Sequence, residues 1–241
     1  MKAKERLILA LDVDTMAEAR RLVELTEDYV GIYKVGMQLY NSEGPAVIRW
    51  LMERRKKVFA DLKFHDIPNT VAQAGEVMTC HGVFMYNVHC AGGREMLSKT
   101  VLATKAEAQG LGLPAPMVIG VTILTSLDQQ AVNNDVGLAG TVQDNVVKYA
   151  RMAQECGLSG VVASPKEITA IREACGPEFV LVIPGIRPQW AAANDQKRIM
   201  TPKEAIAAGA TYIVVGRPIT AAPDPGEAAA KVVREMTSGL S

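Results

Sequence analysis

The chain has 241 residues, and its 26 lysines and arginines balance 26 aspartates and glutamates, so the formal net charge is zero. This balance excludes a polybasic arm, and we predict no nucleic-acid partner. With 49% hydrophobic and 22% charged residues, the composition excludes a wholly disordered chain and is typical of a globular protein. No apolar run approaches the roughly 20 residues of a membrane span, so we expect a cytoplasmic protein with no membrane partner.

The cysteines are scattered along the chain, without a CxxC pair and without a histidine at metal-ligand spacing. They are Cys80, Cys90, Cys156 and Cys175. This pattern indicates reduced thiols that fill the core, and it argues against a structural zinc site. The apolar stretch at residues 7–11 is too short for the hydrophobic part of a signal peptide, which agrees with a cytoplasmic location.

Short runs rich in valine and isoleucine alternate with amphipathic stretches along the whole chain. In chain order, the expected strand and helix pairs are 6–13 with 16–28, 31–36 with 43–54, 57–64 with 70–80, 82–89 with 94–109, 116–124 with 142–156, 159–164 with 166–174, 179–185 with 202–208, and 211–216 with 226–236. Buried parallel strands need helices on their outer face. Eight such units in this length predict an α/β protein with one domain over residues 1–241, a (β/α)8 TIM barrel.

One connection departs from the regular length of these units. Residues 187–200, with the sequence RPQWAAANDQKRIM, follow the seventh expected strand and form a polar loop that is long for such a connection. The loops at this end of a barrel surround its active site. We therefore predict that the segment is an active-site lid.

Charged and polar residues stand at the ends of the expected strands, where a barrel places its active site. They are Asp12, Lys34, Asp61, Lys63, His89, Thr125 and Arg217, the last of which directly follows Gly216. Asp61 and Lys63 should share one face of their strand, because side chains two positions apart point the same way. A structural layer of ion pairs is the alternative, but burying each charge costs several kcal/mol before pairing, and aliphatic residues would fill a core at less cost.

Residues 61–70, DLKFHDIPNT, contain a D-x-K-x-x-D motif, and here the sequence resembles the bacterial orotidine 5′-phosphate decarboxylase family. Other motifs of that family follow in order: LALDVD at 9–14, YKVG at 33–36, FADLKFHDIPNT at 59–70, NVHCAGG at 87–93, LTS at 124–126, PGIRP at 184–188, DQKRIMTP at 195–202 and VVGRPI at 214–219. The resemblance implies a carboxy-lyase that converts orotidine 5′-phosphate to UMP and CO2, the last step of de novo pyrimidine nucleotide synthesis. It implies no cofactor and no metal.

The resemblance also implies an alternating charge array of Lys34, Asp61, Lys63 and Asp66. Loss of CO2 from C6 leaves a carbanion in the plane of the pyrimidine ring, where the π system stabilises it poorly. Lys63 would be the acid that protonates C6, held by opposite charges in a position that stabilises the developing negative charge. Asp61 would lie near the departing carboxylate and disfavour the ground state.

Asp66 lies three residues beyond Lys63, about 10 Å away if the chain stays extended, so we expect it not to reach the lysine of its own subunit. The resemblance implies instead a homodimer with shared active sites. In such a dimer Asp66 crosses the two-fold interface into the partner's site, together with Ile67 and Thr70.

A second group of residues is expected to bind the substrate. Arg217, which follows Gly216 after the eighth strand, offers a guanidinium for bidentate contact in the part of a barrel that often binds phosphate. The resemblance implies that Arg187 and Gln196 of the long loop meet the same phosphate. The remaining implied contacts are to the pyrimidine amide edge and the ribose hydroxyls, through Thr125, Asp12 and Lys34.

Other functions stay open at this point. Magnesium-dependent enzymes of the same superfamily, such as 3-keto-L-gulonate 6-phosphate decarboxylase and hexulose-phosphate synthase, share the D-x-K-x-x-D motif but carry a glutamate where this chain has Lys34. A Schiff-base aldolase would need Lys63 neutral, whereas acidic neighbours favour its charged form. A barrel that only binds a partner would need neither the charged strand ends nor the long loop. His65 is expected to pack or hydrogen-bond rather than react, and His89 either donates to the array or is structural.

Overall fold

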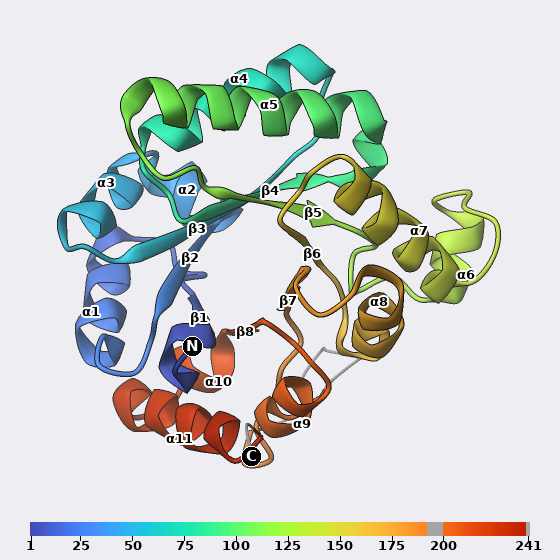
Figure 1. Cartoon of the computed structure of the whole chain (residues 1–241). Helices are drawn as coiled ribbons and strands as arrows, with labels where there is room; N and C mark the ends of the chain where they lie inside the picture. The colour runs from blue at the N-terminus through green and yellow to red at the C-terminus, as the bar shows by residue number, and fades with distance from the viewer. Residues whose placement is uncertain (192–199, 240–241) are drawn as a thin grey trace.

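The computed structural model describes residues 1–191 and 200–239 and has eight parallel strands closed into a barrel (Figure 1). The strands are β1 (Leu7–Ala10), β2 (Ile32–Gly36), β3 (Lys57–Phe64), β4 (Met85–His89), β5 (Met117–Val121), β6 (Gly160–Val162), β7 (Val180–Ile183) and β8 (Tyr212–Val215). Each strand pairs with its neighbours in the chain, and β8 pairs with β1, so that Leu7 stands opposite Ile213. The predicted TIM barrel is confirmed.

Helices surround the strands as an outer ring (Figure 1). They are α1 (Met16–Thr26), α2 (Met37–Glu43), α3 (Ala46–Glu53), α4 (Pro68–Cys80), α5 (Gly93–Leu111), α6 (Gln129–Asn134), α7 (Val142–Glu155), α8 (Ile168–Cys175), α9 (Pro202–Ala207), α10 (Arg217–Thr220) and α11 (Pro225–Thr237), with 3-10 turns at Ala3–Arg6, Cys90–Gly92 and Pro165–Glu167. None of the helices in the described part of the chain combines the length and apolar character needed to cross a membrane.

The helix expected over residues 43–54 is present but shorter, because α3 spans Ala46–Glu53 and the separate helix α2 ends at Glu43. Gly44 has φ 61°, which ends α2, and its N–H donates to the carbonyl of Tyr40 at 2.8 Å. Pro45 then caps the start of α3, where the missing N–H of proline costs nothing. The sequence reading also missed α2, α6 and α10, whose lengths of 7, 6 and 4 residues are too short for a clear helical period.

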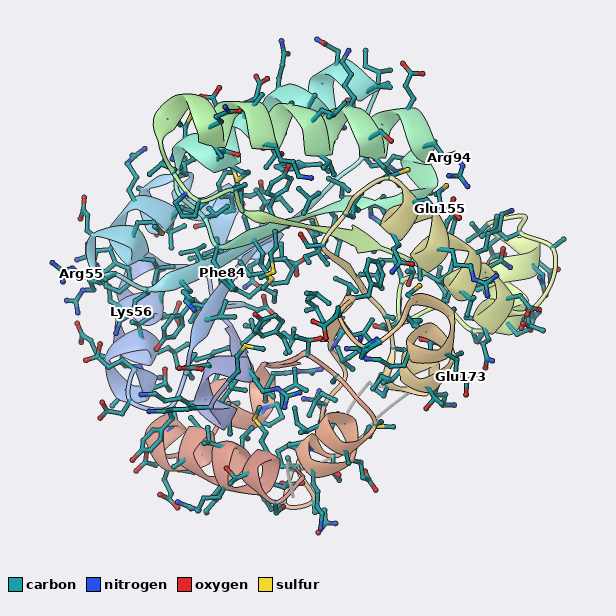
Figure 2. The ribbon with its side chains drawn as sticks, viewed as in Figure 1. Arg55, Lys56, Phe84, Arg94, Glu155 and Glu173 are labelled. Carbon is teal, nitrogen blue, oxygen red and sulfur yellow. The ribbon has the colours of Figure 1, made fainter. Side chains whose placement is uncertain are left out.

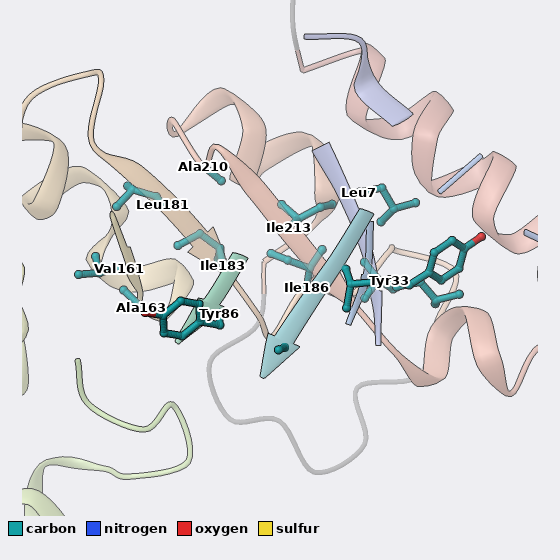
Figure 3. Close-up of a cluster of buried hydrophobic side chains, with 14 of the residues drawn as sticks. Leu7, Tyr33, Tyr86, Val161, Ala163, Leu181, Ile183, Ile186, Ala210 and Ile213 are labelled. Carbon is teal, nitrogen blue, oxygen red and sulfur yellow. The ribbon is translucent and has the colours of Figure 1, made fainter. Parts of the chain in front are cut away.

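Two apolar layers hold the barrel together. The outer layer lies between strands and helices, and Figure 3 shows part of it, with Leu181, Ile183 and Ile213 on the neighbouring strands β7 and β8. The inner layer fills the barrel and contains Ile8, Ile32, Phe59, Met85, Ile119, Val182 and Tyr212. Because most strand residues are buried on both faces of the sheet, the strands are largely apolar rather than alternating.

The inner layer determines where polar side chains can enter the barrel. Side chains two positions further along a strand point the same way, so they form the next layer toward the carboxyl ends. The residues in these positions are Ala10, Lys34, Asp61, Asn87, Val121, Pro184 and Val214. The buried lysine, aspartate and asparagine therefore stand directly on an apolar floor.

Arginine side chains tie together the opposite, amino-terminal end of the barrel. Arg172 of α8 donates to the carbonyls of Phe179 at 2.6 Å and Gly209 at 2.7 Å, and to the Thr211 hydroxyl at 3.0 Å. That hydroxyl in turn accepts the N–H of Leu181 at 3.0 Å. One guanidinium thus joins α8 to the segments that enter β7 and β8. Arg6 similarly donates to the carbonyl of Thr211 at 3.0 Å.

The substitution Arg172→Ala should lower the free energy of unfolding by about 2–4 kcal/mol, because several carbonyls lose a charged donor at once. Urea denaturation followed by circular dichroism measures the change. Arg21→Ala, which removes an exposed arginine from α1, is the matched control and should change stability by less than about 0.5 kcal/mol. Equal effects of the two substitutions would contradict the bridging role of Arg172.

Candidate active site

Two adjacent hollows open at the carboxyl ends of the strands. One has a volume of about 170 Å³ and the other about 240 Å³. Lys34 and Asp61 line both hollows, whereas Lys63 and Thr125 line the first, and Asp12 lines the second. The structure therefore brings the residues predicted at the ends of strands one, two, three and five to a common mouth.

An alternating row of charges crosses this mouth. Lys34 Nζ lies 3.0 Å from Asp12 Oδ1 and 3.1 Å from Asp61 Oδ2. The other carboxylate oxygen of Asp61 lies 2.7 Å from Lys63 Nζ. The Lys34 side chain is 10% exposed and that of Lys63 is 27% exposed, so Lys63 is the amine that a bound molecule can reach more easily.

The shared charges hold the two buried members of the row in their ionised forms. Burial alone would lower the pKa of Lys34, but the carboxylates of Asp61 and Asp12 outweigh burial and raise that pKa. Burial would raise the pKa of Asp61, but Lys34 and Lys63 outweigh it and lower that pKa. Both side chains are therefore charged at neutral pH.

The backbone at Lys63, which places its side chain at the mouth, departs from a regular β-strand. Its φ is 53°, in the left-handed region that non-glycine residues rarely adopt, and the register between β3 and β4 shifts between Ala60 and Phe64. The Asn87 side chain supports this irregularity, because its Oδ1 accepts the Lys63 N–H at 2.8 Å and its Nδ2 donates to Asp61 Oδ1 at 2.7 Å. Backbone strain at an accessible lysine is typical of functional sites.

The sequence reading gave no role to Asn87 or Gly36, although both shape the row of charges. Asn87 is 1% exposed within the apolar strand MYNVH, and a buried amide of this kind needs partners, which is the signal that could have identified it. A Cβ atom at Gly36 would stand 3.0 Å from Lys34 Nζ and 3.1 Å from Asp12 Oδ1. The strand-end glycine thus leaves room for the ion pair.

Asp66 stands apart from the row of charges within its own chain. Its carboxylate accepts the N–H of Ile67 at 2.6 Å, where the chain turns into α4. Among the described residues, no ion pair joins Asp66 to Lys63. Asp66, Ile67 and Thr70 are all exposed, and Ile67 keeps 66% of its surface accessible.

Two arginines line the second hollow. Arg187 and Arg217 meet there beside Asp12 and Gly216. Arg187 is buried at 7% exposure, and its backbone N–H donates to the carbonyl of Met200 at 2.9 Å, so the described ends of the long loop lie side by side. Gln196, like the rest of 192–199, lies outside the described residues.

Two of the three histidines form a pair beside the row of charges. The rings of His65 and His89 lie 5.3 Å apart, centroid to centroid. Burial lowers the pKa of His89, and the neighbouring His65 and Lys63 lower it further, so His89 is neutral at neutral pH. No hydrogen bond among the described residues joins either ring to Asp61, which accepts from Lys63 and Asn87 instead.

The chain is similar to known proteins over nearly its whole length. The family model described as "Orotidine 5'-phosphate decarboxylase / HUMPS family" matches residues 5–232. A protein of Heliobacterium modesticaldum named orotidine 5'-phosphate decarboxylase is 54% identical, with 100% of this chain and 99% of the relative covered. A protein of Moorella thermoacetica with the same name is 52% identical, with 98% of this chain and 94% of the relative covered.

Solved structures agree with these relatives. A crystal structure of orotidine 5'-phosphate decarboxylase from Lactobacillus acidophilus superposes with a TM-score of 0.85 at 34% identity, and covers 95% of this chain and 98% of its own. A structure of an uncharacterized conserved protein from Geobacillus kaustophilus gives a TM-score of 0.82 at 37% identity, with 95% and 99% covered. By sequence over residues 5–232 and by fold, the chain belongs to the orotidine 5′-phosphate decarboxylase / HUMPS family.

Proposed function

We propose that this chain is an orotidine 5′-phosphate decarboxylase that releases CO2 and forms UMP without a metal or other cofactor. The observation that carries the proposal is the Lys34 ammonium, held between the carboxylates of Asp12 and Asp61 at 3.0 and 3.1 Å. The family includes more than one chemistry, and its magnesium-dependent enzymes need a divalent cation among acidic ligands. Here a fixed ammonium neutralises the same carboxylates, which opposes binding of a second cation beside them.

The two hollows match the parts of a nucleoside monophosphate. The first has largely apolar walls with Thr125 at its edge, which suits a pyrimidine ring. The second contains Arg187 and Arg217, whose guanidinium groups suit a phosphate dianion. Lys34 lines both hollows and its partner Asp12 lines the second, so these two residues are placed to meet the ribose hydroxyls. The substrate would therefore span both hollows with its C6 carbon at the row of charges.

The proposed reaction needs one proton and no redox partner. The bond between C6 and the carboxylate breaks, CO2 leaves, and the bonding electron pair stays on C6. Lys63 then donates an Nζ proton to C6 and regains one from solvent. The ammonium is already in place before the bond breaks, because Asp61 holds it at 2.7 Å and Asn87 fixes its backbone at 2.8 Å. Such preorganised charge stabilises a developing carbanion without rearrangement during the reaction.

Asp61 has a second proposed effect. Its pKa is lowered by Lys34 and Lys63 despite burial, so it stays negative when the substrate carboxylate binds nearby. Like charges at short range disfavour the bound ground state, and loss of CO2 relieves that repulsion. Lys34 and Lys63, on either side of Asp61, limit this repulsion, because their positive charges partly offset the charge of the Asp61 and substrate carboxylates.

The active sites are proposed to be shared between two copies of the chain. Asp66 is exposed and is not paired with Lys63 of its own chain, and the adjacent Ile67 presents an apolar side chain to solvent at 66% exposure. In a two-fold dimer these residues, with Thr70, would enter the partner's mouth and complete its charge array. Residues 187–200 are proposed to close over the phosphate as a lid, which would exclude water from the site.

Lys63→Ala should lower kcat for orotidine 5′-phosphate by at least about a thousandfold, because the proton donor and its charge are lost together. Loss of substrate absorbance is followed with EDTA present. UMP affinity, measured by calorimetry, should change by less than about tenfold, since the phosphate contacts remain. Wild-type activity that requires added magnesium ions would instead favour the magnesium-dependent enzymes of the family.

Arg217→Ala should cost roughly 2–5 kcal/mol of transition-state stabilisation, measured as the fall in kcat/KM for orotidine 5′-phosphate. The phosphate-free nucleoside orotidine is the control substrate, and its slow turnover should barely change because it offers no dianion to Arg217. An equal loss on both substrates would mean that Arg217 supports the fold rather than the phosphate.

Mixed dimers test the shared site. Lys63→Ala and Asp66→Ala are each expected to be inactive alone, but subunit exchange between them should restore activity, since one of the two sites in a mixed dimer then has both residues intact. Native mass spectrometry confirms the exchange. If mixed dimers form and stay inactive, Asp66 does not act across the interface.

A further inference from the structure

A third hollow lies at the opposite, amino-terminal end of the barrel. Its volume is about 570 Å³, larger than either hollow of the candidate active site, and within the usual range for small-molecule pockets. The walls come from the three segments that lead into β3, β4 and β5. In a TIM barrel this end serves stability rather than catalysis, so the proposed decarboxylation gives it no role.

The walls of this hollow are mostly apolar, and they are firmly held. Phe84, Pro114, Pro116 and Met117 contribute to them. The Phe84 ring meets the ring of Tyr212 edge-on at 6.2 Å, and Tyr212 belongs to the packed inner layer of the barrel. Phe84 and the prolines therefore offer rigid, flat surfaces on which an aromatic ring could stack.

The rim of the hollow is basic. Arg55, Lys56 and Lys57 line it, and no acidic residue is among the described residues that do. Figure 2 shows Arg55 and Lys56 at the outer edge of the barrel and Phe84 closer to its centre. Lys56 is neutralised by Glu27 at 2.7 Å, whereas Lys57 Nζ lies 4.6 Å from the centre of the Phe84 ring. Arg55 and Lys57 thus leave a net positive charge beside an apolar wall.

The backbone conformation of Arg55 also sets this residue apart, independently of the charge at the rim. Arg55 has φ 56° and ends α3 by donating its N–H to the carbonyl of Met52 at 2.8 Å. Glycine normally occupies this position after a helix, because a Cβ atom is strained there. In this chain glycines with positive φ follow other helices that lead into strands, at Gly82, Gly112, Gly157, Gly176 and Gly209. After α3 the corresponding position is Arg55, although its left-handed backbone is strained for a residue with a Cβ atom.

We propose that this hollow binds a small aromatic anion. Its ring would lie against Phe84 and the prolines, and its phosphate, sulfonate or carboxylate group would meet Arg55 and Lys57. The strained arginine is explained by this role, because glycine would cap the helix equally well but would leave the anion with one cation. The site is separate from the row of charges at the other end of the barrel, and so it does not depend on the proposed decarboxylase activity.

The probe is 8-anilinonaphthalene-1-sulfonate, a fluorescent aromatic sulfonate. Isotope-labelled methionine methyl groups locate it by NMR, since Met52 and Met117 line the hollow and Met37 lies at the opposite end, where α2 follows β2. We expect saturable binding of one probe that shifts the Met52 and Met117 methyl signals and leaves Met37 unchanged. Shifts confined to Met37 and its surroundings would overturn the proposal.

Arg55→Gly is the decisive variant, because it removes the guanidinium and relieves the backbone strain. Affinity at this hollow should fall at least about tenfold, the loss of roughly one charged hydrogen bond, while the melting temperature stays the same or rises. Lys57→Gln should also weaken binding. Arg54→Ala is the matched control, since Arg54 belongs to the same basic run but does not line the hollow. The affinity of this variant for the sulfonate probe should stay within about twofold of the wild-type value.

An uncharged analogue separates anion recognition from simple apolar capture. N-phenyl-1-naphthylamine has the same rings without the sulfonate, and it should bind the hollow at least about tenfold more weakly. Equal affinity of the two probes, or equal affinity of wild type and Arg55→Gly for the sulfonate, would overturn the proposal. Decarboxylase turnover in Arg55→Gly should match wild type, which keeps this result distinct from a failure of the proposed function.

Discussion

The Asp61 carboxylate is the contact on which the candidate site depends. One oxygen lies 3.1 Å from Lys34 Nζ, and the other lies 2.7 Å from both Lys63 Nζ and Asn87 Nδ2. Its neighbours come from three adjacent strands, so Asp61 fixes their side chains relative to one another. Removing this one carboxylate would leave two lysines side by side in a partly buried mouth, and each would then destabilise the other.

The layered interior of the barrel stabilises this contact between charges. Ile32 and Phe59 belong to the packed inner layer, and Lys34 and Asp61 stand two positions further along the same strands. The charges therefore meet directly above a rigid apolar floor, where water is scarce on one side and available on the other. Their attraction is stronger than at a surface, and their desolvation is incomplete. The same arrangement explains why Lys34 and Asp61 stay ionised although both are largely buried.

Much of this architecture could be predicted from the sequence, because its main signals are local. The third strand expected over residues 57–64 coincides with β3, Lys57–Phe64, and the charged residues expected at strand ends, such as Lys34 and Asp61, line one hollow. The left-handed backbone of Lys63 could not be predicted, since it depends on a register shift against β4. The contacts of Asn87 and Arg172 are not predicted for a similar reason: their partners lie 26 and 37 positions away in the sequence, and the pairing of neighbouring strands brings them together.

Closure of the barrel also has a consequence for how the chain acquires its structure. β1 is synthesised first, but one of its two neighbouring strands is β8. Arg6 likewise donates a hydrogen bond to the carbonyl of Thr211, which lies 205 positions later in the sequence. Until the last strand emerges from the ribosome, β1 has an open edge with unpaired backbone groups. Such distant pairing slows folding and leaves partly closed intermediates prone to association with other chains. A truncation that removed β8 would thus expose two strand edges, on β1 and β7, rather than delete one peripheral element.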